Sequence, residues 1–117
     1  MHVLMILNDP PYGTERVYNG LRLALNLLKE AEGASATVFL MADAVAAAKH
    51  GQQTPNGYYN LERMLRGFLG RQGQVLLCGS CMDARGICDA DIVEGSRRSS
   101  LDELTALTAS ADKVLVF

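Results

Sequence analysis

The chain has 117 residues, of which 49% are hydrophobic and 21% charged, and its formal net charge is −2. This length predicts one domain over residues 1–117 with a single buried core, and the composition excludes a disordered chain. The charge balance, with Arg97-Arg98 as the longest basic run, argues against nucleic acid or an anionic membrane as the main partner.

The N-terminal apolar stretch is short and has no basic flank. It predicts a strand rather than an export signal or a membrane span, so we expect a cytoplasmic protein. The three cysteines are then expected to be reduced thiols and not a disulfide framework.

Apolar runs and helix-capping residues alternate along the chain. The first half predicts a strand over 3–7, a helix from a Thr14 cap to Gly33, a strand over 37–42 and a short helix capped by Asp43. After a polar loop over 50–58, the second half predicts a helix from an Asn60 cap to Gly70 and Gly73, followed by a strand over 74–78. One or two helical turns from a Ser80 cap to Gly86 and a short strand over 91–94 are expected next. A Ser100–Glu103 capping box then opens a helix with Leu101, Leu104 and Leu107 inward, and a strand over 113–117 follows.

No hairpin signal joins two apolar runs, because Asn56-Gly57 precedes a helix. Regular alternation of strands and helices is typical of βαβ units with right-handed crossovers. We therefore expect an α/β protein, a three-layer flavodoxin-like sandwich whose mostly parallel sheet has four or five strands and helices on both faces.

Cys78 is the first functional candidate, because it ends a predicted parallel strand. Ligands collect at the carboxyl ends of such strands, where the loop over 8–13 and the turn at Asp43 are also expected. The N–H groups of the following helical turn, together with the charge of Arg85, would favour a thiolate at Cys78. The alternative is a small, buried apolar residue that ends its strand.

Four other kinds of site are less well matched. A thioredoxin-like dithiol would place the Cys78-x-x-Cys81 motif after the first strand and a proline downstream. A zinc site needs four ligands, and Cys88 supplies only a third cysteine. A cysteine hydrolase needs a histidine base, for which only His50 is on a suitable loop. The first loop has no lysine of the kind that nucleotide-binding loops use.

Persulfide transfer needs a nucleophilic thiolate and little else, since the terminal sulfur is accepted and released by thiol exchange. No metal or cofactor is required for it. The residues alone leave this chemistry, a dithiol redox pair and a packing role open.

The sequence also resembles the DsrE/DsrF-like family of small sulfur-relay proteins, and within it the YchN-like members. The resemblance runs nearly end to end and is carried by several motifs in order. These motifs are the loop Asn8 to Glu15, Leu21-Arg22-Leu23-Ala24, the stretch Phe39 to Val45, Gly51-Gln52, Gly57-Tyr58 with Met64-Leu65, Leu77-Cys78-x-x-Cys81-x-x-x-Arg85-Gly86-Ile87, and Ser110 to Leu115. The resemblance implies a parallel α/β fold, homotrimers or homohexamers, and a sulfur-accepting cysteine at Cys78.

On this basis we expect a sulfur carrier in which Cys78 holds the persulfide, Cys81 is an auxiliary thiol and Arg85 stabilises the anion. The pocket is expected to include Asn8, Asp9, Tyr12, Gly13 and Asp43. Expected partners are other copies of the chain and sulfur donor and acceptor proteins. The alternatives are a binding or assembly module whose cysteines only pack, a dithiol redox protein, and an enzyme acting on a small molecule bound between subunits.

Overall fold

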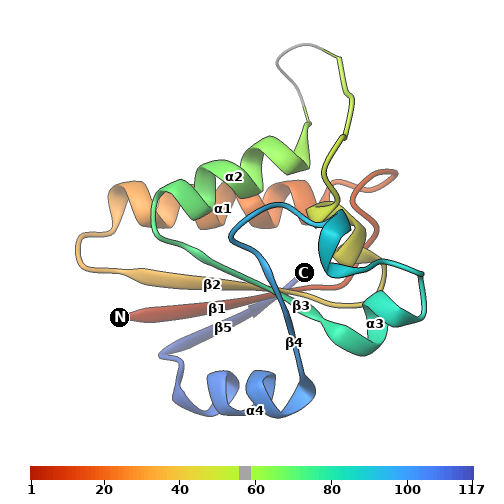
Figure 1. The fold of residues 1–117 in the computed structure, drawn as a ribbon. Helices are drawn as coiled ribbons and strands as arrows, with labels where there is room; N and C mark the ends of the chain where they lie inside the picture. The colour runs from red at the N-terminus through yellow and green to blue at the C-terminus, as the bar shows by residue number, and fades with distance from the viewer. Residues whose placement is uncertain (56–58) are drawn as a thin grey trace.

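The computed structural model describes residues 1–55 and 59–117 and shows a parallel sheet between layers of helices (Figure 1). Its strands are β1 (His2–Leu7), β2 (Ser35–Leu40), β3 (Gln74–Cys78), β4 (Arg97–Ser99) and β5 (Lys113–Val116). Its helices are α1 (Arg16–Glu30), α2 (Leu61–Gly70), α3 (Gly79–Asp83) and α4 (Leu101–Ser110), with 3-10 segments η1 (Ala42–Ala48) and η2 (Asp89–Asp91). The Asn56-Gly57 and Gly57-Tyr58 pairs singled out in the sequence lie outside the described residues.

The strand order is β4-β3-β2-β1-β5, and all neighbouring strands are parallel. The steps from β1 to β4 run in one direction across the sheet, so right-handed crossovers place α1 and α2 on the same face. The last connection crosses back to the far side of β1, so α4 lies on the opposite face (Figure 1). The predicted parallel α/β fold with helices on both faces is confirmed.

The core surrounds the three inner strands, whose two faces are both covered. Nearly every residue of β1, β2 and β3 is buried or half-buried, which explains why each strand reads as a continuous apolar run. Even the polar Thr37 is fully buried, and its hydroxyl donates to Gln74 Oε1 at 3.1 Å. Burial of these strands positions their carboxyl ends, including Cys78, along one edge of the sheet.

The predicted strand over 91–94 is wrong. Ile92 makes only an isolated antiparallel bridge with Lys49, and Val93 N–H donates to Ala48 O at 2.8 Å. Both apolar side chains are buried under this connection and do not extend the sheet. The strand that pairs with β3 is β4, which has no apolar residue because it is a short edge strand.

Two predicted helix caps are confirmed and three are wrong. Asn60 Oδ1 accepts the Arg63 N–H at 3.0 Å, and Ser100 Oγ accepts the Glu103 N–H at 3.2 Å. At the other three positions the side chain has another partner and a neighbouring residue is the N-cap. Thr14 donates to Asp9, and the N-cap of α1 is Glu15. Asp43 pairs with Arg85, and the N-cap of η1 is Met41. Ser80 contacts Cys78, which is itself the N-cap of α3.

The predicted end of α2 at Gly70 is confirmed. The residue in the left-handed conformation after it is Gln72, at φ 66°. Gly73 is required for a different reason, because a Cβ atom there would lie 2.3 Å from the ring of Phe68. A Cβ atom at Gly70 would meet nothing within 4 Å, so of these two glycines only Gly73 is required by packing.

The α4 face of the sheet is only partly covered. Leu104 is buried beneath α4 and Leu107 packs against the core, but Leu101, which was also predicted to face inward, is the first residue of the helix and is 69% exposed. Val114 and Val116 lie on the same face of the edge strand β5 and are 38% and 66% exposed. An apolar strip therefore remains open beside α4.

Candidate functional site

Cys78 lies where β3 ends and α3 begins, and it is 8% exposed. As the N-cap of α3, it turns its sulfur toward the first N–H groups of the helix, which have no partner within the helix. Its Sγ accepts the Cys81 N–H at 3.4 Å and lies 3.3 Å from Ser80 Oγ. The sequence predicted these donors, although it assigned the cap to Ser80.

Opposing effects act on the pKa of Cys78. Burial, the largest effect, raises it, whereas hydrogen bonds from the side chains and backbone N–H groups of Cys81 and Ser80 lower it. Together the hydrogen bonds outweigh burial, so the pKa of Cys78 falls below its ordinary value. Cys78 is therefore the thiol at this site that ionises more readily.

Cys81 faces the same site from α3 but behaves differently. Its Sγ accepts the N–H of Ala42 at 3.2 Å, and Ala42 has a left-handed backbone at φ 49°. Burial raises the pKa of Cys81, and the hydrogen bond and charge of Cys78 raise it further. At neutral pH the pair therefore consists of a thiolate-prone Cys78 beside a protonated Cys81.

Two arginines flank this pair. Arg85 Nη2 forms an ion pair with Asp43 at 2.8 Å, and its Nη1 donates to Cys81 O at 3.0 Å. Arg85 therefore connects α3 to η1, and its charge lowers the pKa of Cys81. Arg98 comes from β4, pairs with Asp83 and passes so close to Gly79 that a Cβ there would lie 2.9 Å from Arg98 Nε.

Arg98 was not among the sequence-predicted site residues. Arg98 lines the same cavity as Cys78, and its pKa is raised by the hydrogen bond to Asp83 first and also by the charge of Cys78. The only available signal was the Arg97-Arg98 pair itself, and nothing in the sequence placed it beside Cys78.

A cavity of about 430 Å³ opens beside Cys78. It lies at the ends of the adjacent strands β3 and β4, whose following connections run to opposite faces of the sheet. The segment after α3 passes Leu69 on the α2 face, whereas β4 leads into α4 on the other face. Such a divergence of connections creates a crevice at the carboxyl ends of parallel strands. Its lining includes Cys78, Ser80, Cys81, Arg98 and Leu101.

The remaining pocket residues predicted from the sequence lie elsewhere. Asn8 Nδ2 donates to Phe117 O at 3.4 Å, and Asp9 accepts a hydrogen bond from Thr14 at 3.3 Å. Tyr12 and Gly13 line a second cavity of about 430 Å³ at the start of α1. Asp43 meets the site only through Arg85. The predicted pocket is thus divided between two places.

The other candidate groups are not assembled into a site. His50 Nε2 lies 2.8 Å from Ala90 O, and the exposed Cys88 hydrogen-bonds Asp91 Oδ2 at 3.1 Å. Among the described residues, no three His, Cys, Asp or Glu side chains are grouped to hold a metal ion. No helix in the described part of the chain is long and apolar enough to cross a membrane.

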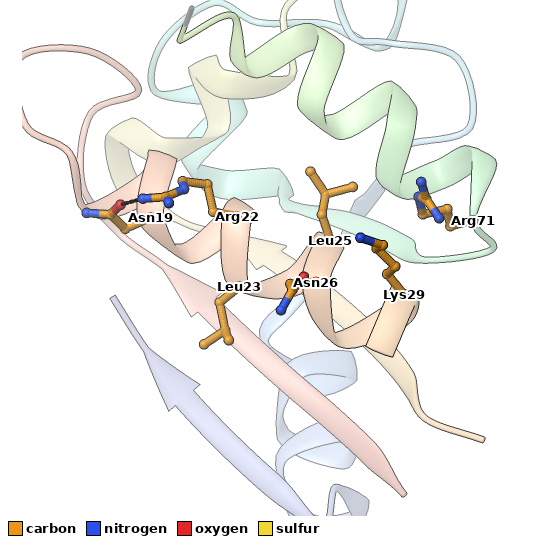
Figure 2. A pocket seen from close by; sticks show the side chains of 7 residues that line it. All are labelled: Asn19, Arg22, Leu23, Leu25, Asn26, Lys29 and Arg71. Carbon is orange, nitrogen blue, oxygen red and sulfur yellow. Dashed lines mark hydrogen bonds between the residues drawn. The ribbon is translucent and has the colours of Figure 1, made fainter. Parts of the chain in front are cut away.

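Another hollow, of about 660 Å³, lies along α1, and no cysteine is among the residues that line it. Figure 2 shows its cations, Arg22, Lys29 and Arg71, spread along the surface without a common centre. Arg22 is already bonded to Asn19 Oδ1 at 3.1 Å. This hollow is an open groove and is unrelated to the cysteines.

Comparisons with known proteins agree with the fold and with the family resemblance of the sequence. A model of the DsrE/DsrF-like family matches residues 1–117. Protein YchN of Escherichia coli (strain K12) is 39% identical over 115 residues, which cover 98% of this chain and 97% of that protein. The uncharacterized protein MJ0989 of Methanocaldococcus jannaschii is 33% identical over 117 residues and covers 100% of both chains.

The crystal structure of the ychN protein from E. coli superposes with a TM-score of 0.94 at 38% identity, covering 100% of this chain and 99% of that one. MTH1491 from Methanobacterium thermoautotrophicum, of unknown function, superposes with a TM-score of 0.79 over 99% and 97% of the two chains. At 15% identity, this second likeness shows the fold alone. Because the family model spans residues 1–117 and YchN is 39% identical over almost the whole chain, the protein belongs to the DsrE/DsrF-like family.

Proposed function

We infer that this protein is a sulfur carrier that accepts sulfane sulfur as a persulfide on Cys78 and passes it to an acceptor thiol. The observation that carries this proposal is the position of the Cys78 sulfur, which receives the Cys81 N–H at 3.4 Å and opens on a cavity of about 430 Å³. A thiolate stabilised by N–H donors beside an accessible cavity suits sulfur exchange. Membership of a sulfur-relay family supports the same function.

The loading step is a thiol exchange that needs no oxidant. The Cys78 thiolate attacks the terminal sulfur of a donor persulfide, R–S–SH, and a new S–S bond forms at Cys78. The original S–S bond breaks, and R–S⁻ leaves with the electron pair. An acceptor thiolate removes the terminal sulfur from Cys78 by the same exchange, and Cys78 leaves as the thiolate.

The donor and acceptor are constrained by the shape of the site. Cys78 is 8% exposed, so a partner must insert its sulfur on a narrow segment into the cavity. We propose donor and acceptor proteins with reactive cysteines as the partners, in the cytoplasm, where thiols stay reduced. Arg98 at the cavity and Arg85 beside Cys81 would balance the negative charge of the reacting sulfurs.

We also propose that the carrier is a homotrimer or homohexamer. Exposed apolar residues support this state: Val114 and Val116 line the open strip on the α4 face, and Leu23 is 40% exposed on α1. Apolar side chains of edge strands are normally covered by a partner or replaced by charges. Family resemblance favours the same assembly.

Intact mass measured shortly after incubation with a small-molecule persulfide tests the carrier function. An increase of about 32 Da, removed by a reductant, is expected in the wild type and in Cys88→Ser, because exchange adds one sulfur atom. Cys78→Ser is expected to gain nothing. If Cys78→Ser gains as much sulfur as the wild type, Cys78 is not the carrier residue.

The main rival is a binding or assembly module in which Cys78 only packs, and the 8% exposure of Cys78 favours it. In that case the wild type gains no sulfur and Cys78 reacts slowly with alkylating reagents, while Cys78→Ser changes the stability of the fold. The mass and alkylation measurements together distinguish the sulfur carrier from the binding or assembly module.

A further inference from the structure

We propose that Cys81 is a second reacting thiol, which discharges a Cys78 persulfide by releasing sulfide and forming a Cys78–Cys81 disulfide. This inference rests on the proposed persulfide at Cys78. It assigns a second reaction to the same site, so the protein releases sulfide when no acceptor thiol is present.

The local backbone brings the two sulfurs together. Cys78 is the N-cap of α3, Cys81 is the third residue of that helix, and the Cys81 N–H already contacts Cys78 Sγ at 3.4 Å. In a capping box, the side chain at each of these two positions reaches the backbone N–H of the other residue, and here both cysteines line the same cavity. Residues three apart have Cβ atoms about 5–6 Å apart, and a disulfide needs about 3.5–4.5 Å, so a small adjustment of this five-residue helix suffices.

The sulfur of Cys81 has its own hydrogen-bond donor. Ala42 donates its N–H to Cys81 Sγ at 3.2 Å from a left-handed backbone, which an alanine rarely adopts. Strain of this kind persists where the surrounding structure imposes it, commonly at functional sites. A cysteine that only fills space needs no donor, whereas a thiolate is stabilised by one.

Loading of Cys78 is expected to activate Cys81. Before loading, the hydrogen bond and charge of Cys78 hold the pKa of Cys81 up, in addition to the larger effect of burial, while the nearby Arg85 lowers it. In a persulfide, the negative charge lies on the terminal sulfur and no longer on Cys78 Sγ. Loading of Cys78 therefore removes part of the effect that raises the pKa of Cys81.

The discharge step balances without an external oxidant. The Cys81 thiolate attacks Cys78 Sγ, which is the inner sulfur of the persulfide and the atom that Cys81 already faces. A Cys78–Cys81 bond forms and the bond to the terminal sulfur breaks. That sulfur takes the proton given up by Cys81 and leaves as HS⁻ with the electron pair. The sulfane sulfur is reduced and the two cysteines are oxidised. A dithiol reductant then returns the disulfide to two thiols by exchange.

The test is a single-turnover discharge experiment. Wild type, Cys81→Ser, Cys81→Ala and Cys88→Ser are loaded with a small-molecule persulfide, freed of donor by desalting, and followed by intact mass and a sulfide assay without reductant. The wild type and Cys88→Ser are expected to lose the sulfur, release one sulfide per chain, and finish about 2 Da below the reduced mass, as disulfide formation requires. Both Cys81 variants are expected to keep the sulfur at least about tenfold longer, because the attacking thiolate is missing.

Two failures are distinguishable. If the wild type and both Cys81 variants load but lose sulfur at equal rates, or if the wild type keeps its sulfur, the discharge by Cys81 is overturned and the carrier function stands. If the wild type and the Cys81 variants show neither an adduct nor sulfide, the proposed function fails and this inference fails with it. Circular dichroism of the two Cys81 variants verifies that each is folded.

Discussion

At the scale of single residues, the ionisation of Cys78 depends on groups from two segments that are distant in sequence. Backbone and side-chain donors come from α3, and Arg98 of β4 lines the same cavity and has its pKa raised in part by the charge of Cys78. Arg85, which the sequence suggested as the anion stabiliser, is bound to Asp43 and lowers the pKa of Cys81. The two arginines are therefore proposed to stabilise different sulfurs.

This division predicts different effects of Arg98→Gln and Arg85→Gln on the pH dependence of alkylation. Arg98→Gln is expected to move the midpoint for Cys78 upward, because a nearby positive charge that favours the thiolate is removed. Arg85→Gln is expected to move the midpoint for Cys81 upward for the same reason. Peptide mapping after timed alkylation separates the two cysteines. Equal shifts at Cys78 in both variants would contradict the assignment.

At the scale of elements, an ion pair joins β4 to α4 and so connects the two elements on one side of the Cys78 cavity. Arg97 donates to both carboxylate oxygens of Glu103, at 2.9 and 2.6 Å, and Ser99 Oγ also donates to Glu103. Arg97 first and Ser99 second lower the pKa of Glu103 to about 2. Because Ser99 and Ser100 line the cavity, this contact fixes part of its wall.

The low pKa of Glu103 predicts a loss of stability in acid. A carboxyl whose pKa is lower in the folded state stabilises the fold above its unfolded value of 4.5, and this stabilisation disappears as the pH falls toward about 2. Glu103→Gln should therefore lower the free energy of unfolding at pH 7 by at most about 1 kcal/mol, the usual value for exposed ion pairs. It should also reduce the pH dependence between pH 4.5 and 2.

Urea unfolding of Glu103→Gln at several pH values measures this effect. Asp102→Asn is the matched control, because it removes a carboxylate from the same first turn of α4 without touching the pair with Arg97. An unchanged acid dependence in Glu103→Gln would show that the ion pair contributes nothing to folding.

At the scale of the whole molecule, strand order explains both the cavity and the open face. After β4 the chain crosses back to the far side of β1, so α4 alone lies on one face of the sheet (Figure 1). The crevice beside Cys78 opens at this change of direction, and the apolar side of β5 remains exposed. If the chain assembles into a homotrimer or homohexamer as proposed, this strip is the candidate contact surface. Leu23, which projects from α1 on the side away from α2 in Figure 2, is the alternative surface.

Charge substitution at these two surfaces is expected to identify the contact. Val116→Lys should reduce the particle mass measured by light scattering below that of the wild type, because a lysine buried in an apolar contact loses its hydration. Leu23→Lys should leave the mass unchanged. The side chains of Val116 and Leu23 are 66% and 40% exposed, so neither change should unfold the chain. A wild type that is monomeric would contradict the proposed assembly itself.

The sequence by itself determined the inner strands, the caps at Asn60 and Ser100, and the position of Cys78 at a strand end. Each of these features depends on a local pattern: a continuous apolar run, a capping side chain, or the end of such a run. Only the tertiary structure decided that Arg98 lies beside Cys78, that Asn8 and Tyr12 lie elsewhere, and that residues 97–99 form a strand. These outcomes depend on which strands are neighbours, and a short edge strand has polar residues on both faces, so its sequence carries no hydrophobic period from which its position could be predicted.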